Sequence, residues 1–236
     1  MKNIIKFAAA CLSVVLMLAS CSEAEDGLVK VTHYATFELL DADANNVTLV
    51  AVGSDYKDAG CICMEGSEDI SSKVVVESDV DTSMMGVYHV VYYATNVDGY
   101  ASSATRTVVV YDPTSIDRNI GGPFAVAPGS YRDYSGSVTP FDGFDVDVTY
   151  IAPGLYYISD YIGGYYDQRA GYGSAYAMAG YFALNNDNTI EALTADVEGW
   201  GDSADDVRGY YDESDGSINL EVDYAGVMTF YVTLAK

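Results

Sequence analysis

The sequence predicts an all-β protein made of two successive β domains. Apolar and polar residues alternate with a period of two along most of the 236-residue chain, which is the pattern of strands with one buried and one solvated face. Helical periodicity is almost absent. The 22 tyrosines and 22 glycines agree with this class, because tyrosine favours strands and glycine favours tight turns between them.

Residues 1–20 predict a lipoprotein signal peptide. Lys2 and Lys6 supply positive charge, and residues 7–18 form an apolar stretch too short to span a bilayer as a stable helix. Residues 18–21, Leu-Ala-Ser-Cys, look like a bacterial lipobox. We therefore expect Cys21 to be lipidated and to become the first residue of the mature protein, held to a membrane by its acyl chains. The alternative is an ordinary secretory signal with a chance cysteine.

Residues 21–34 predict an acidic tether. Glu23, Glu25 and Asp26 follow Cys21 within five residues, and on physical grounds such a run is a solvated spacer. The run also resembles the surface-export signal of Bacteroidetes lipoproteins. This resemblance implies an outer-membrane lipoprotein that faces the extracellular side.

Residues 35–112 predict the first β domain. Residues 87–93 and 105–110 alternate as strands, and about seven short strands separated by turns suit a sandwich of two sheets. Asp112-Pro113 closes this strand-rich block, and Gly121-Gly122-Pro123 follows soon after. We therefore place the domain boundary between residues 111 and 120.

The segments 53–60, 69–74, 80–83, 86–95, 98–99 and 104–110 also have a familiar order and spacing. They resemble the bacterial Ig-like domains that occur as repeats in surface proteins, the DUF5011 type. Cys61, Cys63 and the Asn96-Val97-Asp98 turn depart from the usual pattern of that family. The resemblance covers roughly residues 35–111 and implies an Ig-like β-sandwich that acts as a spacer for another domain.

Residues 118–236 predict a second, tyrosine- and glycine-rich β domain. In residues 144–150 the even positions are apolar and the odd positions polar, so one face is buried. Residues 218–224 and 228–234 alternate in the same way around Ala225-Gly226, which predicts a hairpin. Residues 186–188 and Asp215-Gly216 are further turn signals. The expected architecture is an antiparallel β-sandwich or a meander, lipocalin-like barrel.

Three strings in this domain, residues 154–166, 171–176 and 199–203, carry a second resemblance. They are similar to the C-terminal domain of Bacteroidetes lipoproteins of the DUF5012 or BT2262-like kind. Proteins of this kind often accompany glycan-uptake systems, so the resemblance implies a role in polysaccharide utilization. It carries over no catalytic residue.

The charge balance excludes several functions. The chain has 11 Lys and Arg against 35 Asp and Glu, a formal net charge of -24. Such a field repels phosphate backbones and anionic lipid surfaces, so we expect no nucleic-acid partner and no basic membrane-docking surface. Cys61 and Cys63 have no histidine near them that would complete a zinc site, and we interpret them as small residues at a buried edge.

The candidate site is aromatic. Fifteen of the 22 tyrosines, the only Trp and 16 of the 22 glycines lie in residues 113–236. Aromatic faces stack on the C–H faces of sugar rings, carboxylates accept hydrogen bonds from their hydroxyls, and glycine lets backbone approach a ligand. The candidate ligand-binding residues are Trp200, Tyr161, Tyr165, Tyr166, Tyr172, Tyr210, Asp160, Asp167 and Asp202. Packing in the core or at its rim is the alternative for each tyrosine, because tyrosine suits half-buried strand positions.

Metal binding and catalysis have weaker support. Residues 41–52 begin like an EF-hand loop, but Asn46 replaces the glycine and Val52 the glutamate, so the match fails. Asp202, Asp205 and Asp206 are a possible cation cluster, although a solvated loop fits them better. His33 and His89 both lie in the first half of the chain, so the second domain holds no Ser-His or Cys-His pair.

We therefore expect a non-catalytic lipoprotein on the outer face of the outer membrane that needs no cofactor and no metal. It would bind an extracellular glycan and work beside other outer-membrane uptake proteins. A structural or adhesive protein that binds another protein is the first alternative. A glycoside hydrolase that uses a carboxylate pair is the second.

Overall fold

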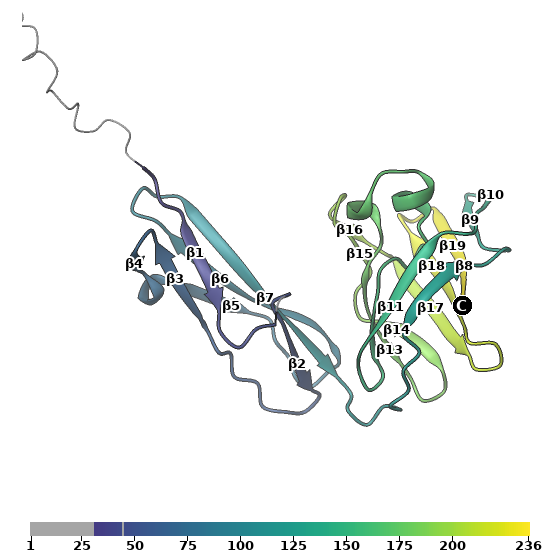
Figure 1. Cartoon of the computed structure of the whole chain (residues 1–236), viewed down its shortest axis with the longest axis horizontal. Helices are drawn as coiled ribbons and strands as arrows, with labels where there is room; N and C mark the ends of the chain where they lie inside the picture. Colours follow the sequence, from purple (N-terminus) through teal and green to yellow (C-terminus); the bar gives the residue numbers. More distant parts are fainter. Residues whose placement is uncertain (1–30, 44) are drawn as a thin grey trace, which may run out of the picture.

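The structure is a computed structural model that describes residues 31–43 and 45–236. The predicted signal peptide, Cys21 and residues 21–30 of the predicted tether lie outside the described residues. Almost all regular structure is β, in two modules joined end to side (Figure 1). No helix within the described residues has the length and apolar character needed to cross a bilayer.

The first module is an Ig-like sandwich of seven strands, as the sequence predicts. One sheet has the order β1 (Ala35–Leu39), β3 (Cys61–Glu65) and β4 (Glu68–Asp69). The other has the order β2 (Val47–Ala51), β7 (Ala101–Tyr111), β6 (Gly86–Thr95) and β5 (Val75–Ser78), with β2 parallel to β7. A short 3-10 turn, η1 (Ser71–Lys73), precedes β5. Cys63 is fully buried, Cys61 is partly buried, and both thiols are free.

The second module is a closed antiparallel barrel of eight strands, so the barrel alternative is confirmed. Its strands follow one another around the ring in chain order, and β19 pairs with β8 to close it. The ring consists of β8 (Gly122–Val126), β11 (Asp145–Ala152), β12 (Leu155–Ile158), β13 (Gly180–Leu184), β14 (Thr189–Ala192), β17 (Asp206–Asp212), β18 (Ser217–Tyr224) and β19 (Met228–Ala235). Two hairpins extend from it: β9 (Tyr131–Tyr134) with β10 (Ser137–Pro140), and β15 (Asp196–Val197) with β16 (Asp202–Ser203).

The barrel interior is filled by the apolar side chains of its alternating strands. The predicted hairpin is confirmed: Ile218 faces Leu234 and Tyr224 faces Met228 across β18 and β19. The turn between them uses positive φ angles of 54° at Ala225 and 66° at Gly226. Because side chains alternate between the faces of a strand, one apolar set from each strand points inward and closes a continuous core.

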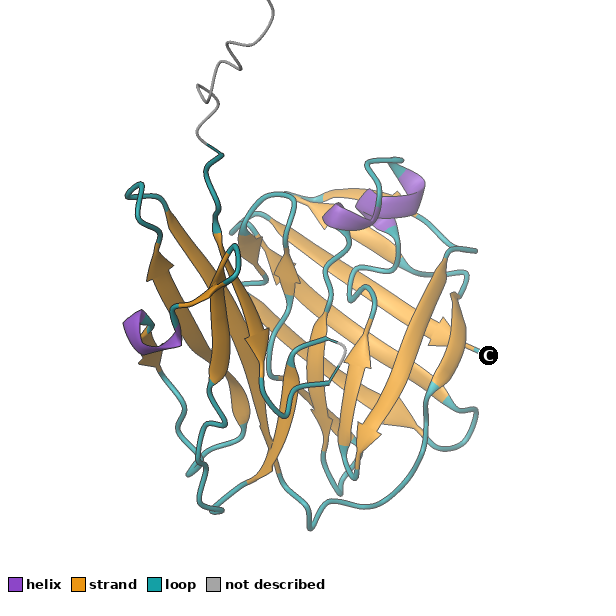
Figure 2. Cartoon of the chain, turned by 60° about the vertical axis from the view of Figure 1, so that its left-hand side comes forward, coloured by secondary structure: helices purple, strands orange, loops and turns teal. Residues whose placement is uncertain are grey.

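The two modules share a small apolar cluster. Val109 of β7 is fully buried in one cluster with Ala152 of β11 and Leu155 of β12, although all three point away from the cores of their own modules. Tyr111 and Tyr181 pack against the same cluster. The Ig-like module therefore lies against the wall of the barrel, as Figures 1 and 2 show.

Candidate functional site

One end of the barrel is covered by the long connection between β12 and β13, residues 159–179. It contains a single π-helical turn, η2 (Tyr165–Arg169), and a 3-10 turn, η3 (Ser174–Tyr176). In Figure 2 these turns are the purple segments above the barrel strands. The candidate site residues from this connection are therefore held over the barrel end.

Asp160 fixes the start of this connection. Its carboxylate accepts backbone N–H bonds from Ile162 at 2.9 Å, Gly164 at 2.9 Å and Met178 at 3.1 Å. The side chain is almost fully buried, and this burial raises its pKa to about 7 against the opposing effect of the three N–H donors. Asp160 therefore ties both ends of the connection together instead of facing a ligand.

Two predicted ligand tyrosines lie in the core. Tyr161 is 0% exposed, and its hydroxyl donates to the carbonyl of Tyr181 at 2.9 Å. Tyr165 is 4% exposed and packs edge-on against Phe141, with ring centroids 5.1 Å apart. The expectation that Asp160, Tyr161 and Tyr165 face a ligand from loops is therefore wrong. The physical reason is that these two rings supply the apolar surface that closes the barrel end.

A connected group of aromatic rings at this end, in which Trp200 and Tyr172 are exposed, is called the aromatic cap: Tyr166, Tyr172, Tyr176, Trp200 and Tyr224. Trp200 is 43% exposed and Tyr172 is 57% exposed. The Trp200 ring lies 4.8 Å from Tyr166 and 5.0 Å from Tyr176, centroid to centroid, and 6.3 Å from Tyr172 and from Tyr224. Three predicted residues, Tyr166, Tyr172 and Trp200, thus meet at one surface.

The loop that carries Trp200 depends on a close approach of backbone. The N–H of Gly199 donates to the carbonyl of Ala175 at 2.6 Å. A Cβ at position 199 would lie 2.7 Å from the ring of Tyr176 and 2.8 Å from that carbonyl oxygen. Only glycine therefore allows this loop to lie on η3, which brings Trp200 against the tyrosines.

Sequence reasoning missed two members of the cap. Tyr224 alternates inward in its strand and is 3% exposed, but its ring stacks beneath Trp200 at an interplanar angle of 25°. Its hydroxyl donates to both carboxylate oxygens of Asp202, at 2.8 and 3.0 Å. Burial, followed by this bond to a carboxylate, raises the pKa of Tyr224. Tyr176 had no distinguishing signal beyond its place in the glycine-rich string at residues 171–176.

The acidic residues near the cap have separate partners. Asp202 accepts from Tyr224, Asp205 accepts the N–H of Gly226 at 2.7 Å, and Asp206 pairs with Arg208. Within the described residues no three His, Cys, Asp or Glu side chains are arranged to hold a metal ion. Asp167 is half-buried in η2. Asp167 and Asp202 are the predicted carboxylates that remain at the surface of this end.

Tyr210 lies elsewhere. It belongs to β17, is 51% exposed, and faces outward on the barrel wall beside Thr189 and Asn219. There it lines an open cleft of about 430 Å³ together with Tyr231 and Arg208. The structure therefore does not bring Tyr210 together with the aromatic cap.

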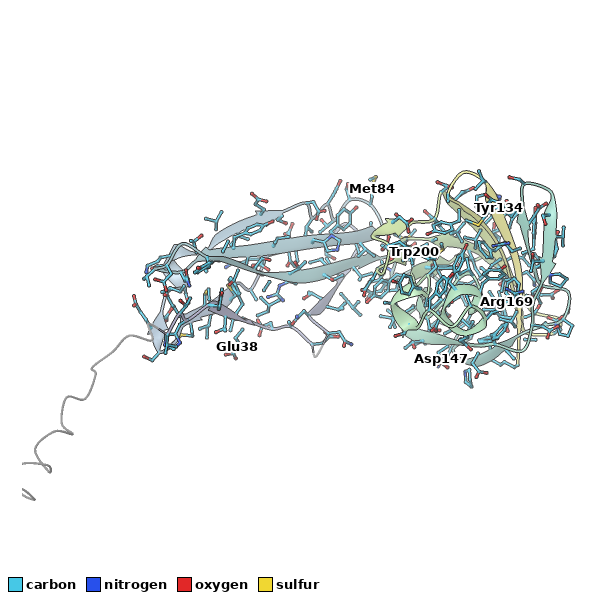
Figure 3. The ribbon with its side chains drawn as sticks, turned by 90° about the horizontal axis from the view of Figure 1, so that it is seen from above. Glu38, Met84, Tyr134, Asp147, Arg169 and Trp200 are labelled. Atoms are coloured by element: carbon cyan, nitrogen blue, oxygen red, sulfur yellow. The ribbon has the colours of Figure 1, made fainter. Side chains whose placement is uncertain are left out.

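Two arginines border the cap. The Cζ atoms of Arg132 and Arg169 each lie 4.8 Å from the ring centroid of Tyr165. Burial raises the pKa of Tyr166, and the Arg132 guanidinium that bonds its hydroxyl opposes this rise. Figure 3 looks onto this end of the barrel and labels both Trp200 and Arg169 there, with Trp200 on the side nearer the Ig-like module.

Two family models match the chain. The model of a bacterial surface protein Ig-like domain matches residues 40–110. A second model, which describes the C-terminal domain of its family, matches residues 112–236, more than half of the chain. No protein of curated function matches.

Solved structures give a further comparison. The chain is 38% identical to the lipoprotein BT2262 from Bacteroides thetaiotaomicron, over 86% of this chain and 100% of that chain, with a TM-score of 0.49. It is 20% identical to a structure of CBM51-2 in complex with GlcNAc and INT domains from Clostridium perfringens ZmpB, over 52% of this chain and 28% of that chain, with a TM-score of 0.29.

Proposed function

The chain belongs to the family of the Bacteroides thetaiotaomicron lipoprotein BT2262, and from this premise we propose that it is a cell-surface lipoprotein whose barrel binds extracellular polysaccharide without cleaving it. The Ig-like module serves as a spacer that holds the barrel away from the membrane. Weak sites on many tethered copies gain avidity on a long polymer. The bound polysaccharide is thereby captured for an uptake system.

The aromatic cap supports this proposal most directly. Trp200 and Tyr172 keep 43% and 57% of their surface exposed, although they belong to a connected group of rings. Aromatic side chains that are fixed by their neighbours and still open to solvent lose little conformational entropy when they bind. Flat, rigid rings of this kind suit the C–H faces of sugar rings.

The carboxylates around the cap favour binding over catalysis. Asp202 already accepts a hydrogen bond from Tyr224 and stays exposed, so its oxygens are available to sugar hydroxyls as acceptors. Asp160, whose burial raises its pKa to about 7, is enclosed by backbone donors at the barrel end and has no access to a substrate. We therefore propose a site that holds its ligand unchanged.

Native electrophoresis in gels that contain single polysaccharides tests the proposal. At least one polysaccharide should retard the protein, and Trp200→Ala should weaken this retention by at least about tenfold, since a central aromatic contact contributes about 2 kcal/mol or more. Tyr210→Ala is the matched control, because it removes an aromatic ring of similar exposure from the barrel wall. We expect the control to keep the retention.

Unchanged mobility with every polysaccharide would contradict the proposal. Equal losses in Trp200→Ala and Tyr210→Ala would place the binding surface elsewhere. Capture of one outer-membrane protein that depends on Trp200 would favour the adhesive alternative, since Trp and Tyr are also enriched in protein interfaces. Release of reducing sugar would favour a hydrolase.

The anchoring is part of the same proposal. We propose that Cys21 carries the lipid and that the barrel faces the extracellular side of the outer membrane. Cys21→Ala should abolish incorporation of labelled fatty acid and release the protein from the membrane fraction. Externally added protease should degrade the wild-type protein on intact cells, and protection from protease would contradict the orientation.

A further inference from the structure

We propose that the polysaccharide bound at the aromatic cap is anionic and that Arg132 and Arg169 bind its carboxylate groups, an inference that rests on the proposed function. The ligand class is therefore a polymer that contains uronic acids. Both arginines lie at the barrel end that carries the cap, and both contact Tyr165, whose ring centroid is 5.2 Å from that of Tyr166 in the cap.

Arg132 has an unusual position for a charged residue. It lies directly opposite Phe230 across β9 and β19. Residues opposite each other in an antiparallel pair point to the same face, and Phe230 is fully buried in the barrel core. The Arg132 side chain is therefore directed over the barrel end, at a position where strand alternation ordinarily places an apolar residue. Its guanidinium lies 4.8 Å from the ring centroid of Tyr165 and 5.5 Å from that of Tyr134.

The two arginines also differ from the others in their partners. Arg106, Arg118 and Arg208 each form an ion pair with at least one carboxylate. Arg132 and Arg169 form none with any described residue, in a chain that has 35 acidic residues. Nε of Arg132 is buried and has no hydrogen-bond partner within the described part of the chain. An unsatisfied buried donor is unfavourable and calls for an explanation.

A carboxylate supplies the ion-pair partner that these two guanidinium groups lack among the described residues. The planar guanidinium presents parallel N–H donors that match the two oxygens of a carboxylate, and ring stacking holds this plane in place before a ligand arrives. A uronic acid residue offers a carboxylate beside an apolar sugar face. One residue of the polymer can therefore stack on the cap while its neighbour, or its own carboxylate, meets an arginine.

Because the protein is acidic overall, its binding of an anionic polymer depends on Arg132 and Arg169. The net charge of -24 repels an anionic polymer. At physiological ionic strength this repulsion is screened beyond about 8 Å, so contacts at the cap determine affinity. Removing both guanidinium charges leaves the carboxylates of Asp167 and Asp202 near the cap, and we expect the preference for an acidic polymer to be lost.

The experiment compares polymers that differ only in charge. Polygalacturonate, alginate and hyaluronan are each tested in 0.15 M salt beside their carboxyl-esterified forms, with dextran sulfate as a separate arm. The wild-type protein should bind at least one acidic form about tenfold more tightly than its ester. The double variant Arg132→Gln, Arg169→Gln should lose this preference. Arg208→Gln is the control, because it removes one guanidinium charge from the barrel wall.

The outcomes separate this inference from the proposed function. Retention of neutral or esterified polymers that depends on Trp200 and is indifferent to both arginines would overturn the inference and keep the proposed function. Binding to dextran sulfate alone would overturn the assignment of a carboxylate. No retention with any polymer would overturn the proposed function itself. Fluorescence of Trp200, the only tryptophan, shows whether the double variant keeps the folded cap.

Discussion

Nε of Arg106 and Oδ1 of Asp58 lie 3.0 Å apart inside the Ig-like sandwich, where the Arg106 side chain is 2% exposed. The guanidinium also donates to the carbonyls of Leu40, at 2.6 Å, and Gly60, at 3.2 Å. The hydroxyl of Tyr92 donates to Asp58 at 2.7 Å. This charge pair and its hydrogen bonds thus connect β7, which carries Arg106, to the segment that carries Asp58 and Gly60 and to Leu40.

Removing one partner of this pair should destabilise the sandwich strongly. Asp58→Ala leaves a buried guanidinium without its counter-charge, and we expect a loss of about 3–5 kcal/mol in the free energy of unfolding. Urea unfolding followed by circular dichroism measures it. Glu68→Gln is the control, because Glu68 pairs with Lys73 at 3.7 Å on the exposed surface and should contribute less than about 1 kcal/mol. Equal losses in the two variants would contradict the prediction.

Asp160 should make the stability of the barrel depend on pH. Burial raises its pKa from the ordinary 3.8 to about 7 in the folded protein, so the folded state favours the protonated form. Its contribution to stability is therefore complete below pH 3.8, falls as pH rises towards 7, and is flat above that value. Asp160→Asn has no ionisable group at this position, so its stability lacks this dependence on pH.

The difference in unfolding free energy between the wild-type protein and Asp160→Asn should thus shrink or change sign as pH rises from about 4 to about 7. Asp167→Asn, a change of the half-buried neighbour in η2, serves as the control. Parallel stability curves for the wild type and Asp160→Asn over this range would show that the carboxylate stays ionised when the chain folds.

Leu155 should link the stability of the two modules. It is 1% exposed and lies in the cluster that also contains Val109 of the Ig-like module. Leu155→Ala should cost about 2–5 kcal/mol, because it leaves a cavity between the modules. Leu49→Ala, at a residue that is 41% exposed, should change thermal stability little. A Leu155→Ala protein that melts at the wild-type temperature would mean that this contact contributes nothing.

Gly199 should control the geometry of the aromatic cap. Its missing Cβ leaves room for the ring of Tyr176, so Gly199→Ala should push the Trp200 loop away from η3. We expect a red-shifted Trp200 emission and weaker polysaccharide retention. Gly201→Ala is the control: a Cβ there meets nothing within 4 Å, although its φ of 68° costs about 1–2 kcal/mol. Identical emission in the wild type and Gly199→Ala would refute this account.

Strand alternation predicted much of the fold, because burial of one face fixes register. Residues 218–234 show this most clearly, since a shift of one residue would have turned Ile218 and Leu234 to solvent. The same pattern contained a signal for Arg106 that sequence reasoning did not use. Arg106 shares a strand face with the buried Val108 and Val110, and a charge at such a position indicates an internal partner.

The candidate site was less predictable, because tyrosines in turns carry no periodicity. Tyr161 and Tyr172 have similar glycine-rich surroundings in sequence, yet one is 0% and the other 57% exposed. Their difference depends on long-range contacts such as the bond between Asp160 and the N–H of Met178, which joins the two ends of the connection over the barrel. The contact between Arg132 and Tyr165 depends on strand pairing that no local pattern specifies.

Neighbouring strands of the barrel differ in the number of facing residue pairs that join them. Seven facing residue pairs join β18 to β19, whereas only Leu234 with Val126 and Ala235 with Ala125 join β19 to β8. Lys236 reinforces this seam by donating to the carbonyls of Ile120 and Gly121. The seam between β8 and β19 therefore has the fewest facing pairs of the barrel, and we expect thermal fluctuations that let solvent reach the interior to separate these two strands first.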